Sequence, residues 1–293
     1  MKKNESVKKK KIYLFIYFVL TLLIILSVMY IIDFFSLKRE AEEESKLLDD
    51  IRVNEIEMNE IEDNQNENIN KNESTNSDNT ESNEVKSQKN IGIKMGKAYT
   101  EKMLKVKKLQ QENSDIVGWI EISGTDINYP VLQGEDNEYY MTHNYKKQKS
   151  RNGSIFLTKD YNWEIPSSNL LIYGHNLQNG TMFQELLKYE SEQYYKEHPT
   201  INFTTEKEDA EYEIIAVLKT RVFYKSEKNV FRYYYFVNAE TEQQYNEFVQ
   251  NAKNESLYNI EATARYGEQL ITLSTCSYHV KDGRFAVIGR KIE

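Results

Sequence analysis

The end of the chain contains one thiol and one guanidinium at a spacing that suits nucleophilic catalysis. Cys276, the only cysteine among 293 residues, ends the apolar, β-prone run ITLSTC, and Arg284 begins the next run, RFAVIGR. Asp282-Gly283 between them is a strong turn signal, so a strand–turn–strand arrangement would bring both groups to one pocket. Positive charge favours the reactive thiolate, and an arginine can bind the oxyanion that forms when a thiolate attacks a carbonyl. The spacing alone equally fits a buried thiol and a surface arginine in an ordinary hairpin.

A cysteine nucleophile needs an acid/base partner, usually histidine, and the sequence offers four. His175 ends the apolar run LLIYGH just before a polar turn. A side chain at the end of a strand lies at the edge of the sheet, where it can face a pocket. His143 and His198 lie in polar loop contexts and are interpreted as surface or structural residues. His279, three residues from Cys276, is a fallback base. None of these residues has zinc-ligand spacing, so we expect neither a metal nor a cofactor.

The elements that would position these residues alternate between short strands and isolated helices. Helical spacing is expected in 98–116, 180–198 and 240–256, and β-prone runs in 117–133, 153–162, 169–176, 210–224, 268–275 and 284–292. There is no regular βαβ alternation. The pattern therefore predicts a largely antiparallel barrel or an α+β domain over residues 91–293.

The N-terminus has the pattern of a signal anchor. Residues 12–32 carry no charge, and six lysines lie in the basic segment 1–11. About 20 apolar residues span a bilayer as a helix, and flanking lysines favour the cytoplasmic side. A cleaved signal peptide would have a shorter apolar run and a small-residue cleavage site. We therefore expect an uncleaved, single-pass anchor with the rest of the chain outside the membrane.

Charge separates a stalk from the globular domain. Residues 40–90 carry 16 acidic and 5 basic side chains, whereas residues 91–293 carry 28 acidic and 25 basic ones. The first composition cannot bury enough apolar surface to offset its ordering entropy, so 33–90 is expected to be a largely disordered stalk. The near-neutral domain lacks the strongly basic character of a nucleic-acid-binding protein.

Several ordered motifs together resemble the sortases, the cysteine transpeptidases of the Gram-positive cell surface, and class B in particular. They are DIVGWIEISGTDINYPVLQ, DNEYYMTH, GSIFL, YGHNLQNGTMF and TLSTC followed by RFAVIGR. The resemblance covers roughly residues 98–293. It implies an extracellular eight-stranded β-barrel with an N-terminal helix and with another helix, here 241–255, before the terminal hairpin.

The resemblance also implies a reaction and residue roles. Cys276 would attack the carbonyl after the threonine of a sorting motif, NPxT-like or PxTG-like, in a secreted protein. His175 would protonate the leaving amine and deprotonate the incoming amine, which belongs to a cell-wall precursor or to another protein subunit. Arg284 would hold the substrate and the oxyanion. The groove for the motif would be lined by Asn137, Met141, Tyr173 and Ser274.

Other readings make distinct predictions. A papain-like protease usually places cysteine before histidine, but His175 precedes Cys276. A cysteine-dependent L,D-transpeptidase has its arginine two residues after the thiol, whereas Arg284 follows by eight. A membrane-tethered cysteine protease and a non-catalytic surface assembly module remain the alternatives, and the second should tolerate loss of Cys276.

Overall fold

The structure is a computed structural model that describes residues 11, 13–32, 35–36, 39 and 102–292. Most of the expected stalk, 33–90, and nearly all of the basic segment 1–11 lie outside these residues. The chain divides into two compact units, 1–60 and 61–293, and each is described by itself.

The first unit contains the expected apolar helix. Residues Tyr13–Ile32 form 20 helical residues, which at about 1.5 Å per residue match the ~30 Å hydrocarbon core of a bilayer. By length and composition this helix is a candidate membrane span. A signal sequence near the N-terminus would satisfy the same criterion.

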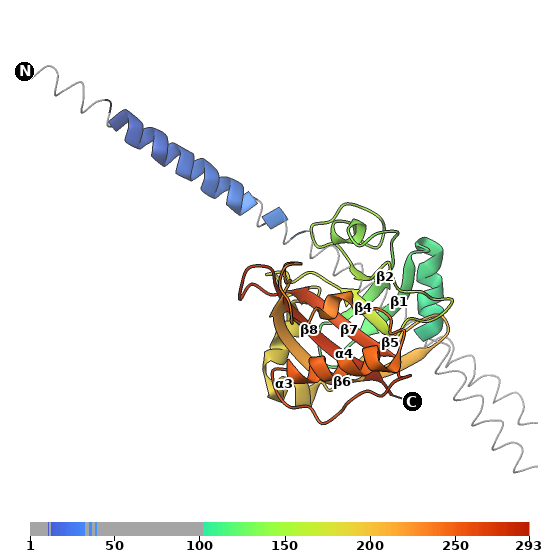
Figure 1. Ribbon diagram of the computed structural model, residues 1–293. Helices are drawn as coiled ribbons and strands as arrows, with labels where there is room; N and C mark the ends of the chain where they lie inside the picture. Colours follow the sequence, from blue (N-terminus) through green and yellow to red (C-terminus); the bar gives the residue numbers. More distant parts are fainter. Residues whose placement is uncertain (1–10, 12, 33–34, 37–38, 40–101, 293) are drawn as a thin grey trace, which may run out of the picture. The chain divides into compact units, whose positions relative to one another are not determined.

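The second unit is built on a closed barrel of eight strands, in the order β1-β2-β3-β4-β7-β8-β6-β5 (Figure 1). The strands are β1 (Ile116–Glu121), β2 (Asn128–Leu132), β3 (Ile155–Leu157), β4 (Asn169–Tyr173), β5 (Thr200–Thr204), β6 (Asp209–Arg221), β7 (Leu270–Cys276) and β8 (Gly283–Lys291). The prediction of an eight-stranded barrel is confirmed. Closure pairs every strand on both sides and removes the free edges on which sheets aggregate.

Two strand pairs are parallel, β2 with β3 and β4 with β7, and the other pairs are antiparallel. Parallel neighbours need a long crossover. Between β4 and β7 this crossover contains β5, β6 and helix α4 (Glu242–Asn254). Strands β4 and β7 thus lie side by side although about a hundred residues separate them, with Tyr173 opposite Ser274.

Helices cover parts of the barrel. Residues 102–112 are helical, as expected for the N-terminal helix. Short 3₁₀ helices are η1 (Tyr139–Met141), η2 (Gln184–Glu190) and η3 (Tyr233–Tyr235). The prediction of one continuous helix over 180–198 is wrong, because η2 is followed by a separate helix, α3 (Glu192–Glu197). Ser191 between them is extended, and its side chain accepts a hydrogen bond from the Tyr194 N–H, which starts a new helix.

Helix α4 packs against one face of the strands that carry the predicted site. Thr241 caps its N-terminus by accepting a hydrogen bond from the Gln244 N–H, and Phe248 is buried on its apolar side. The shared cluster combines residues of α4, η3 and four strands, among them Leu171, Ala216, Leu218, Tyr233, Tyr245, Leu270, Ala286 and Ile288. Alternate residues of a strand share a face. Ser274 and Cys276 in β7, and Arg284 in β8, therefore continue the face that α4 covers.

Candidate active site

Cys276 and Arg284 occupy opposing positions on neighbouring strands. Cys276 is the last residue of β7, and its antiparallel register partner in β8 is Arg284. Opposed residues point to the same face, with Cβ atoms about 4.5–5.5 Å apart. The hairpin loop is longer than a two-residue Asp-Gly turn, because β8 begins at Gly283 and Asp282 takes a left-handed conformation with φ of 57°. A Cβ on Gly283 would lie 2.0 Å from the Ser277 carbonyl oxygen, so only glycine allows this approach.

His175 lies beside Cys276 because β4 and β7 stay joined past the end of β4. The Gly174 N–H donates to the Ser274 carbonyl at 3.1 Å, and Thr275 Oγ1 donates to the Gly174 carbonyl at 2.7 Å. One step further, Asn176 Nδ2 donates to the Cys276 carbonyl at 2.9 Å. Parallel strands lie about 4.8 Å apart. The structure thus places the three residues predicted to do chemistry at neighbouring backbone positions, with Cys276 at the end of β7, Arg284 opposite it in β8 and His175 two residues past the end of β4.

All three residues are partly exposed to solvent. Cys276, His175 and Arg284 are half-buried, and Cys276 is a free thiol. The residues around Cys276 are more enclosed, since Ser274, Thr275 and Ser277 are buried. A peptide could therefore reach the sulfur while the strand that carries it is held firmly.

The imidazole of His175 is oriented by a backbone carbonyl. Its Nε2 lies 2.7 Å from the Met141 carbonyl oxygen, and because a carbonyl can only accept, Nε2 carries the hydrogen of this bond. The backbone of His175 is also held, since its carbonyl accepts a hydrogen bond from the Phe183 N–H at 2.9 Å. Nδ1 is then the ring nitrogen that this bond leaves available.

The Met141 carbonyl is itself supported by a glycine. Gly153 has φ of 61°, and a Cβ built on it would lie 2.7 Å from the Tyr140 and Met141 carbonyl oxygens. The Ser154 N–H donates to the Tyr140 carbonyl at 2.8 Å, which holds the two segments together. A side chain at position 153 would push on the carbonyl that orients His175.

Tyr233 closes the site from the loop between β6 and α4. It is fully buried, and its hydroxyl lies 2.8 Å from Ser274 Oγ, two residues before Cys276. Burial raises the pKa of Tyr233 well above its usual range, although Ser274 and the charge of Arg284 act in the opposite direction. Burial also raises the pKa of Tyr173 to about 12. Both phenols therefore remain neutral hydrogen-bonding groups at neutral pH.

Comparisons with known proteins agree with this geometry. A family model described as the sortase domain matches residues 120–292. Sortase B of Listeria monocytogenes is 36% identical over 190 residues, which are 63% of this chain and 72% of that protein. The chain belongs to the sortase family.

Solved structures place it in class B. The crystal structure of Clostridium perfringens sortase B aligns with a TM-score of 0.58 at 28% identity, covering 64% of this chain and 99% of that one. A Staphylococcus aureus sortase B–substrate complex aligns with a TM-score of 0.58 at 29% identity, covering 71% of this chain and 94% of that one. The protein is therefore a class B sortase, a cysteine transpeptidase of the cell surface that serves cell-wall anchoring.

The groove residues expected from the resemblance are not equally close to this centre. Tyr173 and Ser274 are register partners on β4 and β7, and each lies two residues before His175 or Cys276. Met141 touches His175 through its carbonyl, and its side chain is 41% exposed. The amide of Asn137 instead bonds to the segment after β3, where Oδ1 accepts from the Lys159 N–H at 2.8 Å.

The other three histidines of the sortase domain have separate surroundings. His143 stacks on Tyr139, with ring centroids 4.0 Å apart, and Nδ1 of His198 bonds to the Ser123 carbonyl at 2.8 Å. His279 is exposed on the hairpin loop, and its Nδ1 lies 2.8 Å from Ser277 Oγ. His175 differs from these three because Gly174 and Asn176, on either side of it, form hydrogen bonds with β7.

Two residues that contact the strand carrying Cys276 were not predicted from the sequence. Tyr233 lies in a loop whose members could not be assigned singly, and the aromatic run RYYYF at 232–236 was the available signal. Asn176 belongs to the YGHN motif, but its hydrogen bond to the Cys276 carbonyl depends on the parallel pairing of β4 and β7.

A large hollow lies apart from these groups. The hollow measures about 1170 Å³, and Gln269 and Lys291 in its lining mark the barrel end opposite Cys276. Among the described residues, no three His, Cys, Asp or Glu side chains gather as metal ligands would.

Proposed function

We propose that this sortase cleaves a threonine-containing sorting motif, NPxT-like or PxTG-like, through a thioacyl-enzyme and joins the protein to an amine of a cell-wall precursor. The observation that supports it best is the convergence of Cys276, Arg284 and His175 on adjacent strand ends that remain open to solvent. The related sortase B of S. aureus has been solved as a complex with substrate, which also supports the proposal.

The first half-reaction breaks the peptide bond. Nδ1 of His175 takes the proton of the Cys276 thiol, and the resulting thiolate attacks the carbonyl carbon of the motif threonine. The π-electron pair of the C=O bond moves to the carbonyl oxygen. Arg284 stabilises that oxyanion with its N–H donors. Collapse of the intermediate expels the amine of the next residue, which takes a proton from Nδ1 of His175, and a thioester to Cys276 remains.

The second half-reaction reverses these roles. An incoming amine loses its proton to Nδ1 of His175 and attacks the thioester carbonyl, and the Cys276 thiolate leaves. The Met141 carbonyl keeps Nε2 protonated throughout and therefore fixes which nitrogen exchanges protons. Tyr173, Ser274, Asn137 and the Met141 side chain contact the motif upstream of the cleaved bond.

The enzyme works outside the cell beside its own membrane. The Tyr13–Ile32 helix is the anchor, the lysines before it stay in the cytoplasm, and the barrel faces the precursor amines. Its partners are secreted proteins with a C-terminal sorting signal and a lipid-linked cell-wall precursor.

The experiment pairs motif peptides with an amine. Full-length protein in detergent is incubated with two peptide sets, one NPxT-like and one PxTG-like, with and without triglycine, and products are identified by mass spectrometry. We expect an amide between the motif threonine and triglycine from one set. Hydrolysis alone, unchanged by triglycine, would favour a cysteine protease, and no cleavage of either set would refute the proposal.

Matched variants assign the roles. His175→Ala should abolish product, whereas His279→Ala, which removes an imidazole three residues from the thiol, should retain it. Retention of full activity by His175→Ala would refute its role as acid and base.

A further inference from the structure

We propose that the ion pair between Arg221 and Glu227 is a positioning device that closes the 222–232 loop and thereby lowers KM for the sorting peptide. This inference rests on the proposed function, because it concerns the same groove. Neither residue is expected to touch the reacting atoms.

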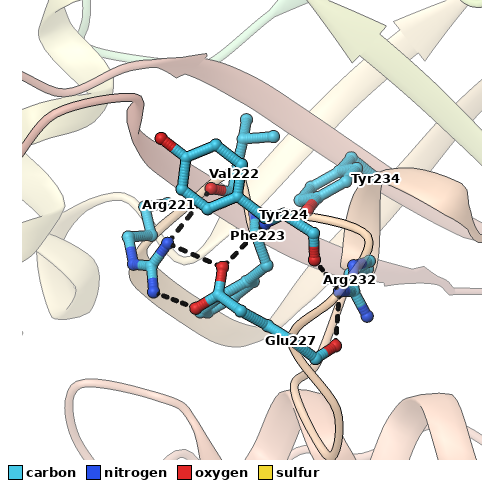
Figure 2. A network of polar contacts seen from close by, with 7 residues as sticks. All are labelled: Arg221, Val222, Phe223, Tyr224, Glu227, Arg232 and Tyr234. Atoms are coloured by element: carbon cyan, nitrogen blue, oxygen red, sulfur yellow. Dashed lines mark hydrogen bonds and ion pairs between the residues drawn. The ribbon is translucent and has the colours of Figure 1, made fainter.

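The ion pair closes the loop on itself immediately after β6 (Figure 2). Arg221 Nη1 and Nη2 donate to the two carboxylate oxygens of Glu227 at 3.2 and 2.5 Å, a two-point contact that fixes orientation as well as distance. The carboxylate also accepts the Tyr224 N–H at 2.7 Å. The guanidinium carbon lies 4.5 Å from the centre of the Phe223 ring, so the cation is held from a second side.

A second arginine fastens the same turn from its far end. Arg232 Nη2 donates to the backbone carbonyls of Tyr224 and Glu227, at 2.6 and 2.8 Å (Figure 2). The Phe223 N–H donates to the hydroxyl of Tyr234 at 2.9 Å. Residues 222–232 therefore form a ring closed by side chains, and its exit leads directly into Tyr233.

This ring connects the hairpin between Cys276 and Arg284 with the segment that contains Tyr233. The sorting peptide would enter between these two segments. At its start, the Val222 N–H donates to the carbonyl of Asp282, on the hairpin between Cys276 and Arg284. At its end, Tyr233 bonds to Ser274 on β7. Opening the ring would loosen the segment that contains Tyr233, while Cys276 and Arg284 would keep their positions on β7 and β8.

The ion pair can hold the loop while contributing little to the stability of the barrel. Both side chains are about one-third exposed, and pairs of that kind contribute little to global stability. Arg221 holds the pKa of Glu227 below its usual range, with the Tyr224 N–H as the next contributor, so the carboxylate stays charged at neutral pH. When only a fraction of molecules has the loop closed, the apparent affinity falls by that fraction.

The test compares Arg221→Ala and Glu227→Gln with a control on the same strand. Lys219→Met removes the ion pair of Lys219 with Glu190, 2.8 Å, which lies outside the loop. Full-length variants in detergent are assayed for transfer of the preferred motif peptide to triglycine. We expect KM to rise about fivefold in both loop variants, with kcat within about twofold, and no change in Lys219→Met.

Two further readouts separate positioning from misfolding. The rate at which iodoacetamide alkylates Cys276 should stay unchanged, and deuterium exchange should rise at the amides of Phe223 and Tyr224 only in the loop variants. The double variant Arg221→Ala/Glu227→Gln should raise KM by less than the product of the two single effects, because both substitutions break the same ion pair.

Unchanged KM in both loop variants, a fall in kcat at constant KM, or an equal effect in Lys219→Met would overturn the inference. A wild-type protein that formed no transfer product would refute the proposed function and with it the effect on KM. Deuterium exchange would still report, separately, whether Arg221 and Glu227 hold the loop.

Discussion

Cys276 and Arg284 are the final register pair of β7 and β8, so the thiol and the guanidinium start from opposed backbone positions on one face of the barrel. Strand pairing fixes this relationship more firmly than a loop could, since Ser274 and Thr275 before the thiol pair with Ala286 and Phe285. The separation of sulfur and guanidinium thus depends on side-chain rotation alone.

Replacing Arg284 with lysine tests whether the fork of N–H donors matters beyond its charge. Lysine keeps the cation but offers a single point of contact, so Arg284→Lys should lower kcat/KM by about 100-fold. Arg290→Lys is the matched control, because Arg290 lies on the same strand and pairs with Glu213 and Glu268 away from the site. Equal activity of Arg284→Lys and wild type in the transfer assay would contradict the assignment.

Removing the hydroxyl of Tyr233 tests whether its hydrogen bond to Ser274 shapes the substrate groove. Tyr233→Phe keeps the ring but deprives the buried Ser274 hydroxyl of its partner, so we expect a rise in KM of about fivefold and a loss of about 1 kcal/mol of stability. Tyr235→Phe, the same change on a side chain that is 67% exposed, should alter neither. Steady-state kinetics and thermal unfolding measure the two effects, and identical behaviour of the two variants would count against the role of Tyr233.

Gly153→Ala tests the support of the His175 imidazole. The new methyl group would press on the Met141 carbonyl, so kcat should fall about tenfold or more, with a smaller change in KM. Gly267→Ala is the control, because Gly267 also has positive φ, 98°, but a Cβ there meets open space. If both variants lose only stability and keep kcat, the Met141 carbonyl does not set the geometry of His175.

Glu185 should make the fold sensitive to acid. Burial alone would raise its pKa, but hydrogen bonds from Lys188, the Asp126 N–H and Tyr194 together hold the pKa below the ordinary value of 4.5. A lowered carboxyl pKa adds stability above the unfolded-state pKa, and this stability is lost as pH falls through the folded-state pKa.

Glu185→Gln should therefore melt about 2–4 °C below wild type at pH 7, and this difference should shrink below about pH 4. Glu192→Gln, which breaks only an exposed pair with Lys196, should leave the melting temperature unchanged at both pH values. A difference that persists undiminished at pH 3 would show that Glu185 acts through packing and not through its charge.

The sequence predicted the parts of this molecule that depend on local pattern. Apolar, β-prone runs predicted β6 and the terminal hairpin, and the position of Cys276 at a strand end followed from the run that precedes it. The same reasoning failed over 180–198. Helical spacing continues across Ser191 there, but its capping hydrogen bond to the Tyr194 N–H starts a new helix.

Long-range relationships could not be predicted from pattern alone. The parallel pairing of β4 with β7 joins segments about a hundred residues apart, and it decides that His175 lies beside Cys276. The bond from Tyr233 to Ser274 and the ring closed by Arg221 and Glu227 also depend on how a loop folds back over the barrel. No local periodicity encodes such contacts.

The central claim is that Cys276 forms a thioester with the threonine of the sorting motif. Intact-protein mass spectrometry of the full-length enzyme tests it most directly, after incubation with the intact peptide of the motif set that the enzyme cleaves and without an amine. We predict an added mass equal to the peptide through its threonine, located on Cys276, lost when triglycine is added and absent in Cys276→Ala. An adduct on another residue, or transfer product from Cys276→Ala, would contradict it.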